Sequence, residues 1–440
     1  MGRLFGTDGI RGVAGTELTR ELAMSLGRAA VLVLGQHARS TPTIVVGRDP
    51  RASGVWLEEA LVEGVRTAGG DVLLAGVQPT PAIAFMTVDL GASAGVVISA
   101  SHNPAEDNGI KFFSRDGMKL SDAIEDEIEA ALGRAAPDAP AGSVTPVEGE
   151  RERYVEHIAG ATLAPLDGLH IVVDCANGSA SDVAPSLLRR LGAQVTAIFA
   201  SPDGVNINDG CGALHPEVVA AEVVRLGADA GVSHDGDADR ALFASADGAV
   251  IDGDQVLAAC AVGLHDAGEL ARNTVVATVM SNIGFERAMA EHGITVRRTK
   301  VGDRYVLEEM EQGGFVLGGE QSGHVIFRRF ATTGDGLLTA VRFLSLGALI
   351  GASVGDLAAV MRRYPQVMRN VRVGDRDAVV SSDIVARAVA TAEEALGNGG
   401  RVLLRPSGTE PLVRVMVEAE TSEAAAAHAD AIATAVAAVA

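Results

Sequence analysis

The chain has 440 residues, a length that exceeds one hydrophobic core and predicts roughly three or four domains. Hydrophobic residues make up 48% and charged residues 21%, so each domain can bury a core. The net charge of −21 excludes a broad nucleic-acid-binding or membrane-binding face, because both need a basic surface. We expect a cytoplasmic protein, since the three cysteines form no CxxC pair and no apolar leader or membrane span is apparent.

The first part of the chain, up to residue 135, alternates between helical and strand patterns. Ser121 is placed to cap the last helix of this part and Gly133 to end it. Short β-branched runs between amphipathic helices are typical of a mainly parallel sheet covered by helices. The predicted helices lie near residues 22–34, 55–68, 81–89 and 121–132, and the strands near 43–46, 72–74, 95–98 and 110–113.

The Ala- and Pro-rich stretch 135–146 is predicted to be a linker, after which the alternation restarts. The last part of the chain differs, because two helices there flank a pair of strands. The predicted elements after the linker are strands at 171–173, 195–198, 230–232, 275–279 and 295–297, a hairpin turn at 247–248, a helix over 336–346, a helix over 383–396, strands around 406–409 and an Ala-rich helix after Thr421.

These patterns predict an α/β protein with three similar mixed-sheet α/β domains and a smaller C-terminal α+β domain. Glycine-rich polar loops stand at strand ends in each domain, and such loops carry the ligand sites of α/β sheets. We therefore expect the loops to meet in one central cleft. The predicted domains span residues 1–145, 150–254, 255–368 and 371–440.

A serine loop follows the apolar strand 95–98. Ser101 is delivered by this strand to a turn that Asn103 and Pro104 hold, which suits a reactive hydroxyl. The alternative is that Ser101 only caps the turn. Ser99 is a rival nucleophile that we rank lower, because it is expected to belong to the strand.

An acidic loop places Asp235, Asp237 and Asp239 at alternate positions. If the loop curls, three carboxylates turn to one point, and all-carboxylate ligation favours Mg²⁺ over Zn²⁺. An EF-hand is excluded, because Arg240 and Ala246 stand where its Gly and Glu are required. The alternative is a solvated acidic turn. A reactive hydroxyl beside a cation site indicates phosphoryl transfer through a serine.

Three further loops have residue types that suit ligand contacts. Residues 7–12 bring Arg11 between glycines, where a guanidinium can meet an anion. Residues 318–324 offer a carboxylate, a hydroxyl and an imidazole for sugar hydroxyls, although a structural His324 is an equal alternative. Residues 405–414 combine hydroxyls and two guanidiniums in a phosphate nest, with a plain hairpin turn as the alternative.

Lysine is rare in this chain: Lys111, Lys119 and Lys300 are the lysines among 36 Lys and Arg residues. An Arg-rich chain keeps lysine where a compact ammonium is needed, so each of the three is a candidate for a specific role.

Taken together and in this order, the five loops resemble those of the α-D-phosphohexomutase superfamily, and the resemblance covers essentially the whole chain. Its motifs stand at residues 99–104, 235–240, 319–324 and 405–411. Within the superfamily, residues 6–12, residues 300–305 and Gln321 resemble the bacterial branch that acts on glucosamine phosphates.

The resemblance implies an isomerase that interconverts glucosamine 6-phosphate and glucosamine 1-phosphate on the route to UDP-N-acetylglucosamine and cell wall. It implies that Ser101 is the phosphoserine, and that one Mg²⁺ per subunit is bound by an oxygen of that phosphate and the three aspartates. A glucosamine or glucose 1,6-bisphosphate would serve as activator. The remaining implied residues are His102, Arg11, Lys111, Arg240 and His324 for catalysis; Glu320, Ser322 and Lys300 for the sugar; and Arg405, Ser407, Gly408, Thr409 and Arg414 for the phosphate that is not transferred.

Three alternative functions remain. The nearest is the phosphomannomutase or phosphoglucomutase specificity of the same superfamily. A metal-dependent sugar phosphatase would leave the Ser101 and Arg405 loops without a role, and a non-catalytic sugar-phosphate sensor would normally lack a ligand or the nucleophile. The expected partner is a small sugar phosphate, and the Ala-rich C-terminal surface could pair two chains as a homodimer.

Overall fold

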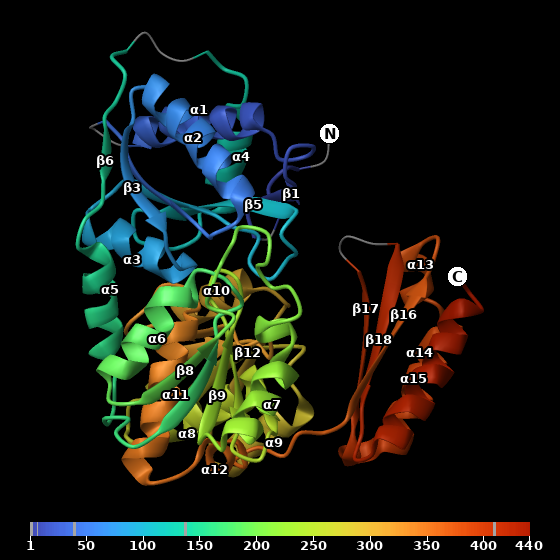
Figure 1. The fold of residues 1–440 in the computed structure, drawn as a ribbon. Coiled ribbons are helices and arrows are strands. Elements are labelled where there is room, and N and C mark those ends of the chain that lie inside the picture. Colours follow the sequence, from blue (N-terminus) through green and yellow to red (C-terminus); the bar gives the residue numbers. More distant parts are fainter. Residues whose placement is uncertain (1–2, 7, 38–40, 136–138, 408–410) are drawn as a thin grey trace. The chain divides into compact units, whose positions relative to one another are not determined.

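The computed structural model describes residues 3–6, 8–37, 41–135, 139–407 and 411–440. The chain divides into two compact units. The larger unit contains Met1–Met280 and Ile294–Ala359, and the smaller unit contains Ser281–Gly293 and Val360–Ala440. Among the described residues, no helix has the length and apolar character that crossing a membrane requires. Figure 1 shows the elements of both units.

The first sheet of the larger unit is mixed, with the order β1-β5-β4-β2-β3-β6. Strands β4, β2, β3 and β6 run parallel, whereas β5 and β1 pair antiparallel at one edge. Helices α1, α2 and α4 lie on one face of the sheet and α3 on the other (Figure 1). The bounds are β1 Ile10–Val13, α1 Arg20–His37, β2 Thr43–Arg48, α2 Ala52–Thr67, β3 Asp71–Val77, α3 Thr80–Asp89, β4 Ala94–Ile98, β5 Asp107–Ser114, α4 Asp122–Ala130 and β6 Val144–Pro146.

The predicted linker 135–146 is wrong at its C-terminal end, because Val144–Pro146 forms β6 and pairs with β3. A short edge strand is difficult to recognise among turn-forming residues, because such a strand needs hydrogen bonds on one side only and tolerates proline. Ser121 caps α4 as expected, and its side chain accepts the N–H of Ile124.

The second and third sheets repeat the mixed pattern, with the orders β11-β10-β9-β7-β8 and β13-β12-β14-β15. In each sheet the parallel strands include the one that leads into a polar loop, and antiparallel strands form one edge. The strand bounds are β7 His170–Asp174, β8 Gln194–Ile198, β9 Ala230–His234, β10 Ala241–Ser245, β11 Val250–Ile251, β12 Thr274–Thr278, β13 Thr295–Thr299, β14 Leu317–Gly319 and β15 Val325–Phe327.

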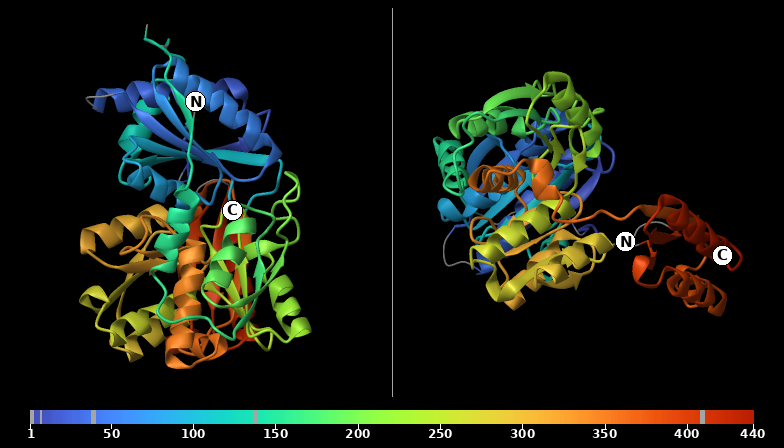
Figure 2. Two further views of the ribbon diagram at one scale, coloured as in Figure 1. Left: turned by 60° about the vertical axis from the view of Figure 1, so that its left-hand side comes forward. Right: turned by 90° about the horizontal axis from the view of Figure 1, so that it is seen from below.

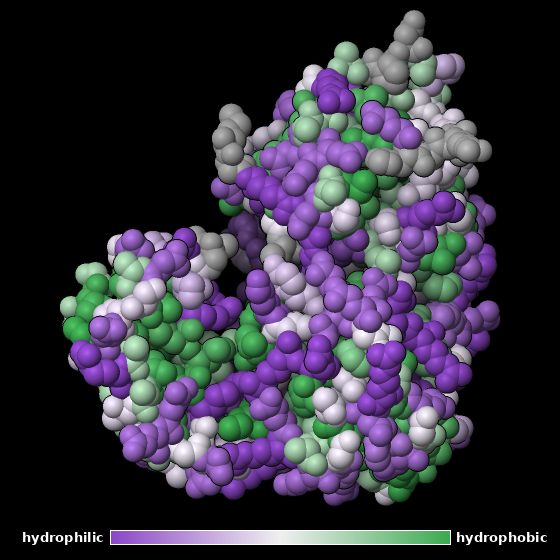
Figure 3. Space-filling view, turned by 180° about the vertical axis from the view of Figure 1, so that it is seen from behind, coloured by the Kyte–Doolittle hydropathy of each residue, from purple (hydrophilic) through white to green (hydrophobic). Residues whose placement is uncertain are grey.

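Helix α11 connects the helices beside the second sheet with those beside the third sheet, because it packs on α8 and also on α5 and α6 (Figure 2). Its N-cap is Asp335, whose side chain accepts the N–H of Leu338. On the face shown in Figure 3, hydrophilic residues are spread over most of the larger unit. The helix bounds are α5 Glu150–Ala159, α6 Ala180–Arg190, α7 Pro216–Leu226, α8 Gly253–Asp266, α10 Asp303–Gly313, α11 Gly336–Ile350 and α12 Val354–Ala358, with 3₁₀ turns at Gly212–Leu214 and Ala271–Asn273.

The smaller unit has an antiparallel sheet with the order β16-β18-β17. Helices α14 and α15 pack on it around a core that includes Val385, Val415 and Ile432. The three similar α/β sheets and this α+β unit confirm the predicted fold class. The bounds are α9 Ile283–Glu291, β16 Gln366–Arg372, α13 Arg376–Val380, α14 Asp383–Leu396, a 3₁₀ turn at Gly397–Gly399, β17 Arg401–Pro406, β18 Leu412–Glu418 and α15 Ser422–Ala437.

Candidate active site

The site is built from loops at the carboxyl ends of strands in all three sheets of the larger unit. Ser101 follows β4, Asp235 follows β9, and Glu320 follows β14. Polar groups at the carboxyl end of a parallel strand face the usual ligand position of an α/β sheet. The sequence predicted that these loops meet, because a glycine-rich polar loop stands at a strand end in each domain.

Ser101 adopts a left-handed backbone conformation with φ 51°, which is uncommon for a residue with a side chain. Its hydroxyl donates to Asp235 Oδ2 at 2.6 Å and lies 3.2 Å from His102 Nδ1. The residue is almost fully buried, at 2% exposure. The strand thus delivers the hydroxyl to the acidic loop of another sheet, 134 residues away in sequence.

Ser99 lies one residue beyond the end of β4, so the reason for ranking it lower was wrong. Its hydroxyl donates to Asp49 Oδ2 at 2.6 Å and accepts the N–H of Ser101 at 2.9 Å. Ser99 is therefore a support of the serine loop, and both of its hydrogen bonds hold it away from the acidic loop.

The acidic loop does curl, because one oxygen from each of Asp235, Asp237 and Asp239 lies within 4.8 Å of the others. All three carboxylates are buried. Two of their oxygens, Asp237 Oδ1 and Asp239 Oδ1, have no hydrogen-bond partner among the described residues. Burying unpaired carboxylate oxygens is costly, and a hard divalent cation removes that cost. These residues form a candidate metal-binding site.

Electrostatics agree with this assignment. Burial, reinforced by the neighbouring carboxylates, raises the pKa of Asp235 well above its ordinary value and also raises that of Asp237. The pKa of Asp239 is low despite burial, because His324 stabilises its charged form. Carboxylates this close resist ionising together unless a cation joins them.

Thr80 also belongs to this site and was missed by sequence reasoning. Its hydroxyl donates to Asp237 Oδ2 at 2.6 Å, and its N–H donates to Asp237 O at 2.9 Å. Thr80 begins α3 behind Pro79, and that pattern indicates a helix start but no partner. The pairing spans 157 residues, so only the tertiary fold reveals it.

The three predicted catalytic cations all lie beside carboxylates. Lys111 Nζ is 2.8 Å from Asp8 Oδ1, and Arg11 donates to Asp8 Oδ2. Arg240 Nε lies 3.9 Å from Asp235 Oδ2 and 3.7 Å from an Asp239 oxygen. Burial lowers the pKa of Lys111, but Asp8, Asp237 and Asp239 outweigh this effect and raise it.

The two predicted histidines have different surroundings. Burial, with the guanidiniums of Arg240 and Arg11, lowers the pKa of His102 to about 4, so this ring is neutral at pH 7. His324 Nε2 accepts the N–H of Gly334 at 3.0 Å, while Nδ1 faces Asp239 Oδ2 at 3.4 Å. Both ring nitrogens of His324 are engaged with the protein, which suits a support of the metal loop better than a proton carrier to substrate.

The predicted sugar loop is partly open for a ligand. Glu320 Oε1 accepts the N–H of Gly302 at 3.0 Å. Ser322 Oγ is buried and has no hydrogen-bond partner among the described residues. Lys300 is exposed, and its Nζ lies 5.9 Å from the centre of the Tyr305 ring.

The predicted phosphate loop belongs to the smaller unit. Arg405 and Arg414 are cross-strand neighbours on β17 and β18. Burial and the charge of Arg414 lower the pKa of Arg405. Ser407 is buried, and its N–H donates to Leu412 O at 2.9 Å. Gly408 and Thr409 lie outside the described residues.

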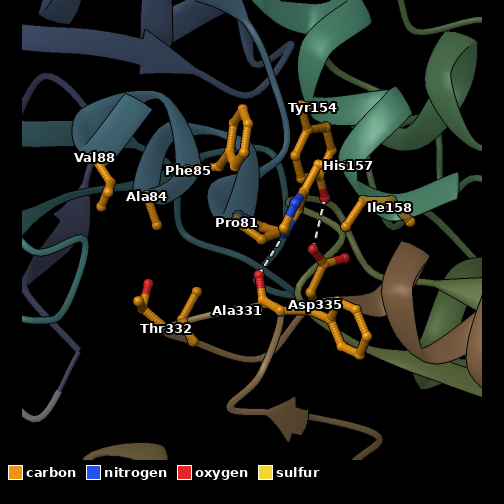
Figure 4. Close-up of a pocket in the computed structure, with 12 residues that line it drawn as sticks. Pro81, Ala84, Phe85, Val88, Tyr154, His157, Ile158, Ala331, Thr332 and Asp335 are labelled. Atoms are coloured by element: carbon orange, nitrogen blue, oxygen red, sulfur yellow. Dashed lines mark hydrogen bonds between the residues drawn. The ribbon is translucent and has the colours of Figure 1, made fainter. Parts of the chain in front are cut away.

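The larger unit also has a mainly apolar pocket of about 200 Å³ between α3, α5 and residues 330–335 (Figure 4). Rings of Phe85, Tyr154 and His157 line it, and Tyr154 donates to Asp335 Oδ2 at 2.8 Å. The carboxylates of the metal-binding site do not line this pocket.

Models of four phosphoglucomutase/phosphomannomutase domains match the chain. Alpha/beta/alpha domain I matches residues 2–137, domain II 152–248, domain III 252–364 and the C-terminal domain 368–435. These matches parallel the predicted division of the chain, whose boundaries stay a prediction.

Curated relatives align with the whole chain. The phosphoglucosamine mutase of Rhodococcus jostii (strain RHA1) is 56% identical and that of Thermobifida fusca (strain YX) 54% identical, covering 100% and 98% of both chains. Among solved structures, a phosphoglucomutase/phosphomannomutase family protein from Burkholderia thailandensis has a TM-score of 0.82 at 28% identity, over 99% of this chain and 97% of that one. An N-acetylphosphoglucosamine mutase from Aspergillus fumigatus, in complex with GlcNAc-6P and magnesium, has a TM-score of 0.73 at 18% identity, over 99% and 96%.

Proposed function

The chain belongs to the phosphoglucomutase/phosphomannomutase family, and we propose that it is an isomerase that interconverts glucosamine 6-phosphate and glucosamine 1-phosphate through a phosphorylated Ser101. The phosphoglucosamine mutases from Rhodococcus jostii and Thermobifida fusca support the amino-sugar substrate. The product serves UDP-N-acetylglucosamine and cell-wall precursor synthesis.

One observation carries the chemistry: the Ser101 hydroxyl donates to Asp235 at 2.6 Å, inside a buried three-carboxylate cluster. A serine in an ordinary turn has no need of such neighbours. A phosphate ester on this hydroxyl and the three aspartates would together give a hard divalent cation an all-oxygen ligand set, and Mg²⁺ is the cation that this chemistry favours. When bound, the ion would offset charge on the phosphoryl oxygens and orient them.

The reaction then has two balanced steps. In the first, the bond between phosphorus and Ser101 Oγ breaks as a new bond to the sugar O1 forms, which gives a 1,6-bisphosphate, and the proton of the O1 hydroxyl passes to Ser101 Oγ. The bisphosphate then turns around in the site. In the second step, the bond between phosphorus and O6 breaks as a bond to Ser101 Oγ forms, and the serine proton passes to O6. Lys111 and Arg240 would offset the charge that spreads over the phosphoryl oxygens, and Ser101 would be presented in line by its fixed turn.

The remaining site residues act on the rest of the sugar phosphate. Glu320 and the unpartnered hydroxyl of Ser322 would hold sugar hydroxyls. Arg405, Ser407 and Arg414, with Gly408 and Thr409, would hold the phosphate that is not transferred. A dissociated 1,6-bisphosphate would leave an unphosphorylated enzyme, so glucosamine or glucose 1,6-bisphosphate is expected to act as an activator.

The experiment is a coupled assay with a mass-spectrometric search for phosphate on Ser101. Ser101→Ala is expected to abolish turnover while glucosamine 6-phosphate still binds, and Ser99→Ala, the matched control, is expected to keep phosphate on Ser101. Turnover near the wild-type rate in Ser101→Ala would exclude this serine as the carrier. The same assay with glucose and mannose phosphates tests the phosphoglucomutase and phosphomannomutase alternatives.

A further inference from the structure

The proposed reaction gives no role to Lys119, although lysine occurs only three times in the chain. Its side chain is 11% exposed. The Nζ atom lies 2.7 Å from Asp8 Oδ1 and 2.5 Å from Asp303 Oδ2. Asp8 precedes β1 of the first sheet, whereas Asp303 begins α10 beside the third sheet. One ammonium group therefore joins carboxylates from two sheets.

On the side of the first sheet, Lys119 reaches two of the predicted catalytic cations through Asp8. The Asp8 oxygen that meets Lys119 also lies 2.8 Å from Lys111 Nζ. The other oxygen of Asp8 accepts from Arg11. The position of Asp8 therefore sets the positions of Lys111 and Arg11, and Lys119 is one of the groups that hold Asp8.

On the side of the third sheet, Lys119 reaches the metal loop through Asp303. The Asp303 oxygen that meets Lys119 is 3.9 Å from His324 Nε2. The opposite nitrogen of His324 faces Asp239 Oδ2 at 3.4 Å. Asp303 is thus an electrostatic neighbour of His324 and makes no hydrogen bond to it, because His324 Nε2 already accepts the N–H of Gly334.

We propose that Lys119 is a positioning residue for the phosphoryl transfer, which holds Asp8 and Asp303 together and thereby fixes Lys111 on one side and balances the charge beside His324 on the other. The proposal rests on the proposed function. A compact ammonium suits this place, because it can meet two carboxylates at short distance in a buried space where a planar guanidinium needs more room. Lys119 acts through its neighbours and is not placed on the substrate.

Arg304, the residue that follows Asp303, supplies a matched control. Arg304 Nη1 donates to Asp122 Oδ1 at 2.5 Å, and this pair joins the same two segments, the start of α10 and the start of α4. Asp122 is 56% exposed, however, and the pair does not contact Asp8. Arg304→Met therefore tests whether tethering the segments is sufficient, while Lys119→Met tests the buried bridge.

The test compares kcat and KM for glucosamine 6-phosphate at saturating Mg²⁺ in four proteins: wild type, Lys119→Met, Arg304→Met and the double variant Lys119→Met/Asp303→Asn. Lys119→Met is expected to lower kcat about 100-fold with KM little changed, since misplacement of catalytic groups by about 1 Å costs that much. Arg304→Met is expected to stay within about threefold, as for exposed ion pairs. The double variant is expected to recover about tenfold over Lys119→Met, because it no longer buries an unpaired Asp303 charge.

If Lys119 acted only through packing, the losses of kcat from the two substitutions would multiply in the double variant. Recovery of kcat in the double variant therefore shows that Lys119 acts through its charge. The proposal is overturned if kcat of Lys119→Met stays within about threefold of wild type, if Arg304→Met falls equally far, or if the double variant is slower than Lys119→Met. Circular dichroism and intact mass establish that each variant is folded and equally phosphorylated. Failure of the proposed function is recognised separately, by turnover in Ser101→Ala.

Discussion

Arg51 provides the most quantitative test of how the serine loop is held. Its side chain and that of Asp49 are fully buried, and the two form an ion pair at 2.9 Å. The guanidinium also donates to Ser101 O at 3.0 Å, to Asn103 O at 2.8 Å and to Pro104 O. Arg51 thus holds three carbonyls of the turn that presents the candidate nucleophile.

We predict that Arg51→Met destabilises this loop by about 3–5 kcal/mol, the usual cost of removing one partner from a buried ion pair. The Asp49 carboxylate would remain buried with the Ser99 hydroxyl and one backbone N–H as donors. Asn208, which donates to Ser101 O and Asn103 O at 2.9 and 3.0 Å, would keep the turn from opening fully. Turnover should fall when the loop is destabilised, because Ser101 would leave its left-handed conformation.

Hydrogen exchange of peptides that span residues 99–109 measures this effect, since it reports local opening and does not require the chain to unfold in one step. A loss of about 3 kcal/mol corresponds to about 100-fold faster exchange of protected amides such as that of Ser101. The control is Arg20→Met, which removes an exposed pair with Glu59 and should change exchange by less than about fivefold. Unchanged protection in Arg51→Met, or equal loss in both variants, would refute the reasoning.

Two further predictions address the metal loop and a buried carboxyl. Thr80→Val should weaken Mg²⁺ activation about tenfold, because the hydrogen bond that orients Asp237 is lost. The control is Thr87→Val on the same helix, which should leave Mg²⁺ activation unchanged. Equal activation constants in the two variants would contradict the role of Thr80. Burial raises the pKa of Asp335 to about 6, so the folded state binds a proton that the unfolded state releases near pH 4, and stability falls as pH rises between these values. The free energy of unfolding of Asp335→Asn, relative to that of wild type, should therefore rise by about 3 kcal/mol between pH 4 and pH 6. A pH-independent difference between the two proteins in urea unfolding would exclude this linkage.

The strand-end loops were predictable because their residues are close in sequence. Ser101 stands three residues after an apolar strand and before a proline, and Asp235 to Asp239 alternate within five positions. Such short patterns fix both the turn and the chemistry that the turn presents.

The scarcity of lysine marked Lys119 as a candidate for a specific role, but the partners of these loop supports could not be predicted, because they lie in distant segments. Thr80 meets Asp237 across 157 residues, and Lys119 meets Asp303 across 184. No local pattern marks a threonine or a lysine for a particular carboxylate. Lys300, in contrast, was chosen from a motif, and the structure places it beside Tyr305 with an exposed side chain.

Charge balance ties the candidate active site together. Arg11, Lys111 and Arg240 are each engaged with a carboxylate before any substrate arrives, so these three cations offer little unbalanced positive charge to a sugar phosphate. A phosphate on Ser101 adds close to two negative charges, and a divalent cation on the acidic loop adds two positive ones. Phosphorylation and metal binding would therefore leave the buried charge of the site nearly unchanged. We propose that the second phosphate is recognised by Arg405 and Arg414, which are adjacent guanidiniums of the smaller unit.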